Sequence, residues 1–152
     1  MFQNIVFAYD GSVESRDALA EGIALARHFD ARCHLLAVVS LPPSAVLAAG
    51  ALPLETDEAF FRTILEEGVS RLRQAGVEAT GSLRTWEEPA GAIVAFARET
   101  GADLVVIGHH RRSAFDRFWH GSVGHSILDQ LPCSLFISMH RQGMEKADTN
   151  QE

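Results

Sequence analysis

Three short runs of this chain, residues 2–8, 31–39 and 104–107, are apolar at nearly every position. A strand with one face in water alternates apolar and polar residues, so continuous runs indicate strands that are covered on both faces. Sheets covered on both faces are typically parallel, and parallel strands need crossover connections between them. The pattern therefore predicts an α/β fold.

The segments between these runs carry apolar residues at helical spacing. Ser12 can cap the first helix. Further helices are expected at residues 60–72, 89–100 and 123–131. Further strands are expected at residues 77–84, 104–107 and Ser134–Met139, the first of them at an edge of the sheet. Five strands alternating with four helices predict a Rossmann-like open parallel sheet with helices on both faces. The strongly apolar 104–107 strand is expected at its centre.

Length and charge narrow the class of protein further. The 152 residues suit one domain, expected over residues 1–140, and the polar residues 141–152 are expected to form a disordered tail. No targeting segment and no apolar stretch of bilayer length is visible, which predicts a cytoplasmic protein without a membrane partner. The net charge of −7 argues against nucleic acid as a partner.

A long polar loop after residue 107 is the strongest ligand signal. Gly108 opens it, and Gly121, Ser122 and Val123 lead into the next helical pattern. Free backbone N–H groups at a helix start bind phosphate, and glycine lets an anion approach the backbone. The loop is longer than an ordinary strand-to-helix connection. We therefore favour phosphate binding over a simple turn.

Asp10 follows the first strand and has two open interpretations. Its carboxylate can accept a hydrogen bond from a ligand, or it can belong to a turn with Gly11 and Ser12 that leads into the helix.

The residues that a Walker-type phosphate loop or a histidine metal site would need are missing from the sequence. The chain has one lysine, Lys146, in the tail, so a Walker-type phosphate loop is excluded, and the histidines around the loop follow no metal-site spacing.

Together these motifs resemble the universal stress protein family over residues 2–139. The resemblance rests on Asp10-Gly11-Ser12 after the first strand, on residues 101–108, and on Gly108, Gly121 and Ser122 at the family's signature spacing. The signature's second glycine is Arg111 here. Arginine would cost free energy if that position needs a positive φ or close phosphate approach, and its side chain could equally replace a lost contact with a charge-assisted one.

The resemblance implies an adenine-nucleotide alpha-hydrolase-like fold, a homodimer paired through the last strand, and binding of ATP or another adenine nucleotide, with Mg²⁺ as a candidate companion ion. It implies a stress-response regulator with at most weak ATP hydrolysis, and no catalytic residue. The alternative is a nucleotide-independent dimeric interaction module. By resemblance, the base and sugar would meet Ala8, Asp10 and Val38, and the phosphates would meet Gly108, His109, Arg111, Gly121, Ser122 and Val123.

Overall fold

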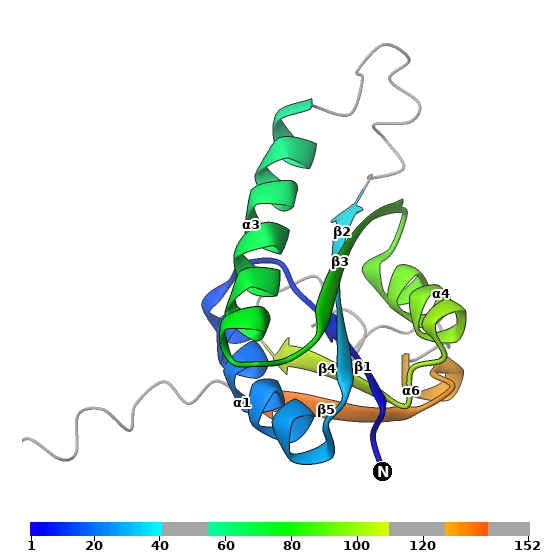
Figure 1. Ribbon diagram of the computed structural model, residues 1–152. Coiled ribbons are helices and arrows are strands. Elements are labelled where there is room, and N and C mark those ends of the chain that lie inside the picture. Colours follow the sequence, from blue (N-terminus) through cyan, green and yellow to red (C-terminus); the bar gives the residue numbers. More distant parts are fainter. Residues whose placement is uncertain (41–54, 110–126, 140–152) are drawn as a thin grey trace, which may run out of the picture.

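The computed structural model describes residues 1–40, 55–109 and 127–139 (Figure 1). In chain order these ranges form β1 (Asn4–Ala8), α1 (Val13–Phe29), β2 (Arg32–Ser40), α3 (Glu55–Gln74), β3 (Ala79–Trp86), α4 (Pro89–Thr100), β4 (Leu104–His109), α6 (Ile127–Gln130) and β5 (Ser134–Met139). The expected tail, residues 141–152, lies outside the described residues, so the proposed domain boundary stays a prediction.

The five strands form one parallel sheet in the order β3-β2-β1-β4-β5. β2 and then β3 are added on one side of β1, and β4 and then β5 are added on its other side. The predicted parallel sheet is confirmed, and β3 lies at an edge as expected. The expected centre is wrong, because β1 is the middle strand and β4 is its neighbour. A continuous apolar run indicates that a strand is covered on both faces, which is true of both β1 and β4. It does not indicate which of the two lies at the centre of the sheet.

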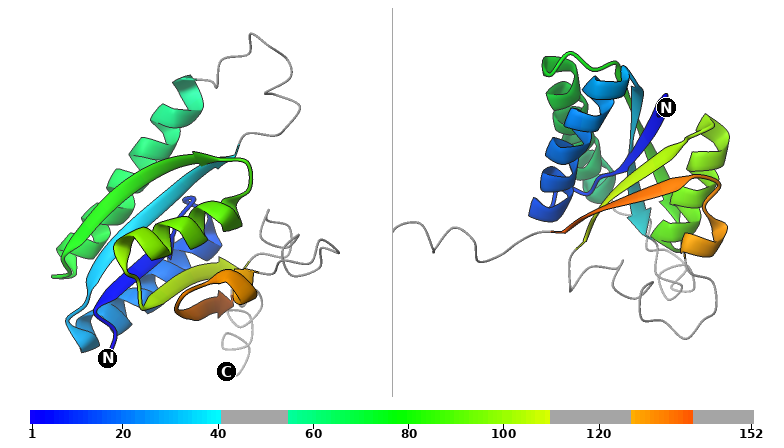
Figure 2. Two further views of the ribbon diagram at one scale, coloured as in Figure 1. Left: turned by 90° about the vertical axis from the view of Figure 1, so that its right-hand side faces the viewer. Right: turned by 90° about the horizontal axis from the view of Figure 1, so that it is seen from below.

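Helices cover both faces of the sheet, as Figure 2 shows: α1 and α3 lie on one face, and α4 and α6 on the other. Alternate residues of the inner strands supply two separate cores. Phe7 and Val106 belong to the core under α1 and α3, whereas Val6 and Val105 belong to the core under α4. All four side chains are almost fully buried. The continuous apolar runs therefore arise from two-sided burial.

Local signals set most helix ends. The Ser12 hydroxyl accepts a hydrogen bond from the Ser15 amide at 3.2 Å and caps α1. Pro89 occupies the first turn of α4, and Gly101, with a φ of 62°, ends that helix in the left-handed region. Helix α3 begins at Glu55, earlier than the apolar periodicity suggests, because its first turn carries no apolar repeat.

A half-buried histidine links two strands beneath α4. The His34 ring on β2 makes a hydrogen bond between its Nδ1 and the Thr80 hydroxyl on β3 at 2.9 Å, and it lies edge-on to Phe96 at 6.5 Å. Burial lowers the pKa of His34, the nearby charge of Arg32 lowers it further, and Glu78 acts in the opposite direction. The folded protein therefore favours the neutral ring.

This shift predicts a pH-dependent stability. Below the ordinary histidine pKa of about 6.5, the unfolded chain binds a proton that folded His34 resists, so the free energy of unfolding falls as the pH drops below that value and is retained above it. Chemical denaturation at pH 7.5 and pH 5.5 measures the loss. We expect a smaller loss in His34→Gln than in the wild type. Equal losses in both proteins would contradict this assignment.

Candidate functional site

The carboxyl ends of β1 and β4 lie side by side where the strand order reverses. Phe7 pairs with Val106 in the parallel register, and Ala8 pairs with Leu36 of β2 on the other side. From this point the chain leaves β1 and β4 in opposite lateral directions. In open α/β sheets, such a reversal leaves a crevice outside the strand ends, where ligands bind.

Several of the predicted ligand residues meet at this point. Ala8 on β1 and Val38 on β2 both pack into the core on the α4 face. His109 ends β4, two residues after Ile107, which belongs to the same core, and side chains two apart on a strand share a face. The structure therefore brings Ala8, Val38 and His109 to one end and one face of the sheet. Asp10 follows β1 at the same end.

Asp10 makes the turn that one interpretation of the sequence predicted. Its Oδ1 accepts a hydrogen bond from the Ser12 amide at 2.9 Å, and Gly11 between them has a φ of 77°. Asp10 is nevertheless exposed. A carboxylate has about four acceptor positions on its two oxygens, so this bond leaves capacity for a ligand donor. The turn and ligand interpretations are therefore compatible.

Gly108 packs against the protein's own helix. A Cβ built on Gly108 would lie 2.3 Å from the Glu14 carbonyl oxygen and 2.9 Å from the Ser15 amide nitrogen. Both atoms belong to the backbone of the first turn of α1, which cannot move aside as a flexible side chain can. The sequence predicted close backbone approach at Gly108. The close approach observed is that of α1, and approach of a phosphate stays a proposal.

Buried polar side chains around this contact were not foreseen. Glu14, Ser15 and Ser138 are all less than 9% exposed. Ser138 pairs in register with Gly108, and its hydroxyl has no hydrogen-bond partner among the described residues. The alternation in β5 places Ser138 on the same face as Phe136. The sequence did not show that an edge strand would be buried there.

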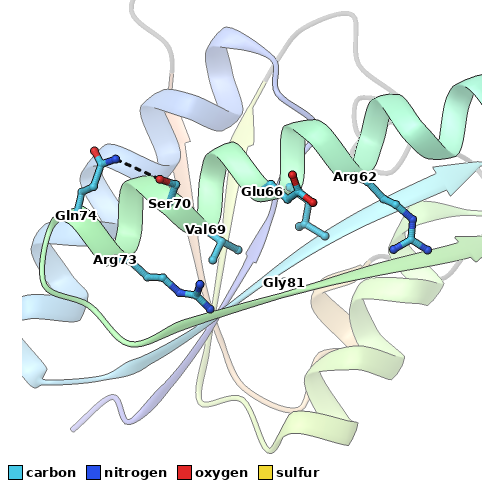
Figure 3. A pocket seen from close by; sticks show the side chains of 8 residues that line it. Arg62, Glu66, Val69, Ser70, Arg73, Gln74 and Gly81 are labelled. Carbon is cyan, nitrogen blue, oxygen red and sulfur yellow. Dashed lines mark hydrogen bonds between the residues drawn. The ribbon is translucent and has the colours of Figure 1, made fainter.

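The other predicted ligand residues, Arg111, Gly121, Ser122 and Val123, lie outside the described residues. Grooves elsewhere do not substitute for this site. One groove lies between α3 and β3 (Figure 3), and another lies at the amino ends of β2 and β3, opposite the strand ends that carry Asp10 and Gly108.

Metal and thiol chemistry have little support in the described ranges. These ranges hold no cluster of three or more His, Cys, Asp or Glu side chains arranged for a metal ion. Burial raises the pKa of Cys33 to about 12, which keeps that thiol protonated. No helix in the same ranges is long and apolar enough to cross a bilayer.

Comparisons with known proteins agree with this architecture. The model of the universal stress protein family matches residues 1–138. A putative universal stress protein of Staphylococcus epidermidis is 28% identical over 138 residues, which cover 90% of this chain and 83% of that protein.

Solved structures show the same fold. A universal stress protein family member from Burkholderia pseudomallei is 28% identical with a TM-score of 0.69, over 90% of this chain and 95% of that one. The universal stress protein from Archaeoglobus fulgidus in complex with dAMP is 25% identical with a TM-score of 0.65, over 90% and 97% of the two chains. The predicted Rossmann-like fold is confirmed.

The contact at Gly108 predicts an unequal response of two glycines to alanine. Gly108→Ala forces the α1 backbone away from β4 and should lower the free energy of unfolding by about 1–3 kcal/mol, the usual cost of overpacking. Gly91→Ala is the matched control. Its Cβ would lie 2.7 Å from Nε1 of the exposed Trp86 side chain, which can move aside where the α1 backbone cannot, and alanine favours the helix, so any loss of stability should be smaller than for Gly108→Ala. Urea denaturation compares them, and equal stability of the two variants would contradict the assignment.

Proposed function

The chain belongs to the universal stress protein family, and we propose that it binds an adenine nucleotide at the carboxyl ends of β1 and β4 and acts as a cytoplasmic stress-response regulator. One observation carries the proposal: the sheet reverses its strand order where Ala8, Asp10, Val38 and His109 come together. The role proposed is binding, with ATP hydrolysis weak at most.

The chemistry of these residues suits a nucleoside. The partly buried Val38 side chain offers apolar surface for a base, the backbone beside Ala8 would line the same pocket, and the exposed Asp10 carboxylate can accept a hydrogen bond from a sugar hydroxyl. The Archaeoglobus fulgidus relative was solved in complex with dAMP. A deoxyribonucleotide keeps its 3′-hydroxyl, so a bond of this kind to Asp10 is available with either sugar.

The phosphates would lie toward the segment that follows β4. Gly108 and His109 end that strand, and we propose that Arg111, Gly121, Ser122 and Val123 contact phosphate oxygens, with Mg²⁺ as a companion of ATP. In this proposal Gly108 acts mainly by packing, since its backbone already lies against α1. Arg111 would then supply a charge-assisted hydrogen bond in place of the family's second glycine.

Calorimetry with dAMP, AMP and ATP tests the binding site. Loss of a hydrogen bond to a charged group costs about 1.5–3 kcal/mol, so Asp10→Ala should weaken binding roughly 10- to 100-fold. Ser12→Ala is the matched control, because it removes the α1 cap from the same turn without removing the carboxylate. We expect its affinity to stay near the wild-type value.

Two outcomes would count against this proposal. Equal weakening in Asp10→Ala and Ser12→Ala would assign Asp10 to the turn alone. A wild-type protein that binds no adenine nucleotide at millimolar concentration, together with an Arg111→Gly variant that does bind, would favour the second candidate. That candidate is a nucleotide-independent dimeric interaction module, and the presence of Arg111 at a signature glycine position motivates it.

A homodimer through β5 is the second part of the proposal. β5 is an edge of the sheet, its three central apolar side chains (Leu135, Phe136 and Ile137) are only half-buried, and Met139 is 58% exposed. An apolar strand edge is a template for pairing with another chain, and a second copy would cover it.

Sedimentation velocity at micromolar concentration should therefore show a dimer. Met139→Lys places a charge on the β5 edge and should shift the protein toward monomer. Thr85→Lys, which adds the same charge at the opposite edge on β3, should leave the dimer intact. A wild-type monomer, or equal dissociation in both variants, would refute pairing through β5.

A further inference from the structure

Among the described residues, nothing pairs with the outer edge of β3, which is available to another strand. The Glu78 carbonyl accepts from the Cys33 amide and therefore points toward β2, whereas the Ala79 carbonyl accepts from the Arg73 guanidinium at 2.9 Å and points outward. Backbone groups alternate in direction along a strand, so those of Gly81, Leu83 and Thr85 also point outward. None of these three residues has a backbone partner on that side among the described residues.

The usual features that protect an edge strand are missing from β3. Its eight residues pair with β2 in unbroken register, without a bulge, and include neither proline nor lysine. Arg84 turns to the other face, where its guanidinium lies over Phe96 and pairs with Glu99. Arg73 covers the Ala79 carbonyl only. Within the described part of the chain, the edge from Gly81 onward is therefore unpaired.

A groove of about 650 Å³ runs along this edge between α3 and β3 (Figure 3). Its apolar part is formed by Leu65 and Val69, which approach Gly81 so closely that a Cβ there would lie 2.9–3.0 Å from them. Because Gly81 has no side chain, the groove extends to the strand backbone. It can take alternate side chains of a strand that pairs with β3.

The charges that line the groove indicate what it would accept. Arg62 and Arg73 reach from α3 toward β3 (Figure 3), and Glu66 lies between them in sequence. Arg62 holds an exposed ion pair with Glu58, which contributes little stability and can exchange. Arg73 uses its Nε and one Nη for the Ala79 carbonyl and keeps further N–H donors. The lining groups therefore favour carboxylates near each arginine and a neutral side chain near Glu66.

We infer that β3 and this groove form a docking site for an extended, acidic segment of a partner protein, which adds to the sheet as a further strand. The two arginines are roughly three helical turns apart, about 16 Å along α3. A strand covers that distance in about five residues. Because side chains two apart share a face, carboxylates four residues apart lie on one face about 13 Å apart, and the long arginine side chains can span the difference of about 3 Å.

Titration of the full-length, ¹⁵N-labelled protein tests this docking site. The probe is a nine-residue peptide with blocked ends that alternates valine and threonine and carries two aspartates four residues apart; the control peptide has lysines there. The aspartate peptide should slow hydrogen exchange at Gly81, Leu83 and Thr85. Arg62→Gln should weaken its binding roughly two- to fivefold, as expected for an exposed ion pair.

A backbone variant tests strand addition separately from charge. Thr85→Pro removes an outward N–H group and keeps the hydrogen bonds to β2, so the affinity for the aspartate peptide should fall at least about fivefold. Thr85→Val keeps that N–H group and should leave the affinity unchanged. If Thr85→Pro fails to fold, the Arg62→Gln variant and the comparison of the aspartate and lysine peptides still test the docking site. No change at millimolar peptide, equal binding of the lysine peptide, or protection confined to β5 would overturn the inference.

Discussion

The contact between Gly108 and the backbone of α1 is the constraint on which the site depends. It places the first turn of α1 directly against the carboxyl end of β4, at 2.3 Å from where a Cβ would be. The same turn follows β1 through Asp10 and Gly11, with Ser12 as its cap. One helix start is thus fixed to both strand ends at the point where the sheet reverses, which sets the position of Asp10 relative to Gly108 and His109.

The parallel sheet also leaves two edges with different chemistry. β5 offers half-buried apolar side chains and an exposed Met139, which suits a second copy of the same chain. β3 is more exposed, and the adjoining groove is lined by Arg62 and Arg73. A polar edge whose groove presents two arginines beside Glu66 favours a different partner from an apolar one. Self-association and partner docking can therefore occupy opposite sides of the molecule without competing.

Signals that act locally were read correctly from the sequence. The last strand was predicted at Ser134–Met139 as observed, and Ser12 caps α1 through a hydrogen bond that its position alone suggested. Lateral strand order was not accessible, because two-sided apolarity is the same for β1 and β4. The packing of Gly108 and the burial of Ser138 depend on residues distant in the sequence, so no local pattern announces them. The effect of Arg111 on nucleotide binding is likewise not predictable from the sequence, because it depends on the backbone conformation at that position.

The most direct test of the central claim is an amide chemical-shift titration of the full-length protein with dAMP. If the nucleotide binds where the sheet reverses, the largest shifts should fall on Tyr9 to Ser12 and on Gly108 and His109, with smaller changes along the first turn of α1. Shifts that map instead to the groove beside Gly81, or an unchanged spectrum at millimolar dAMP, would contradict the account.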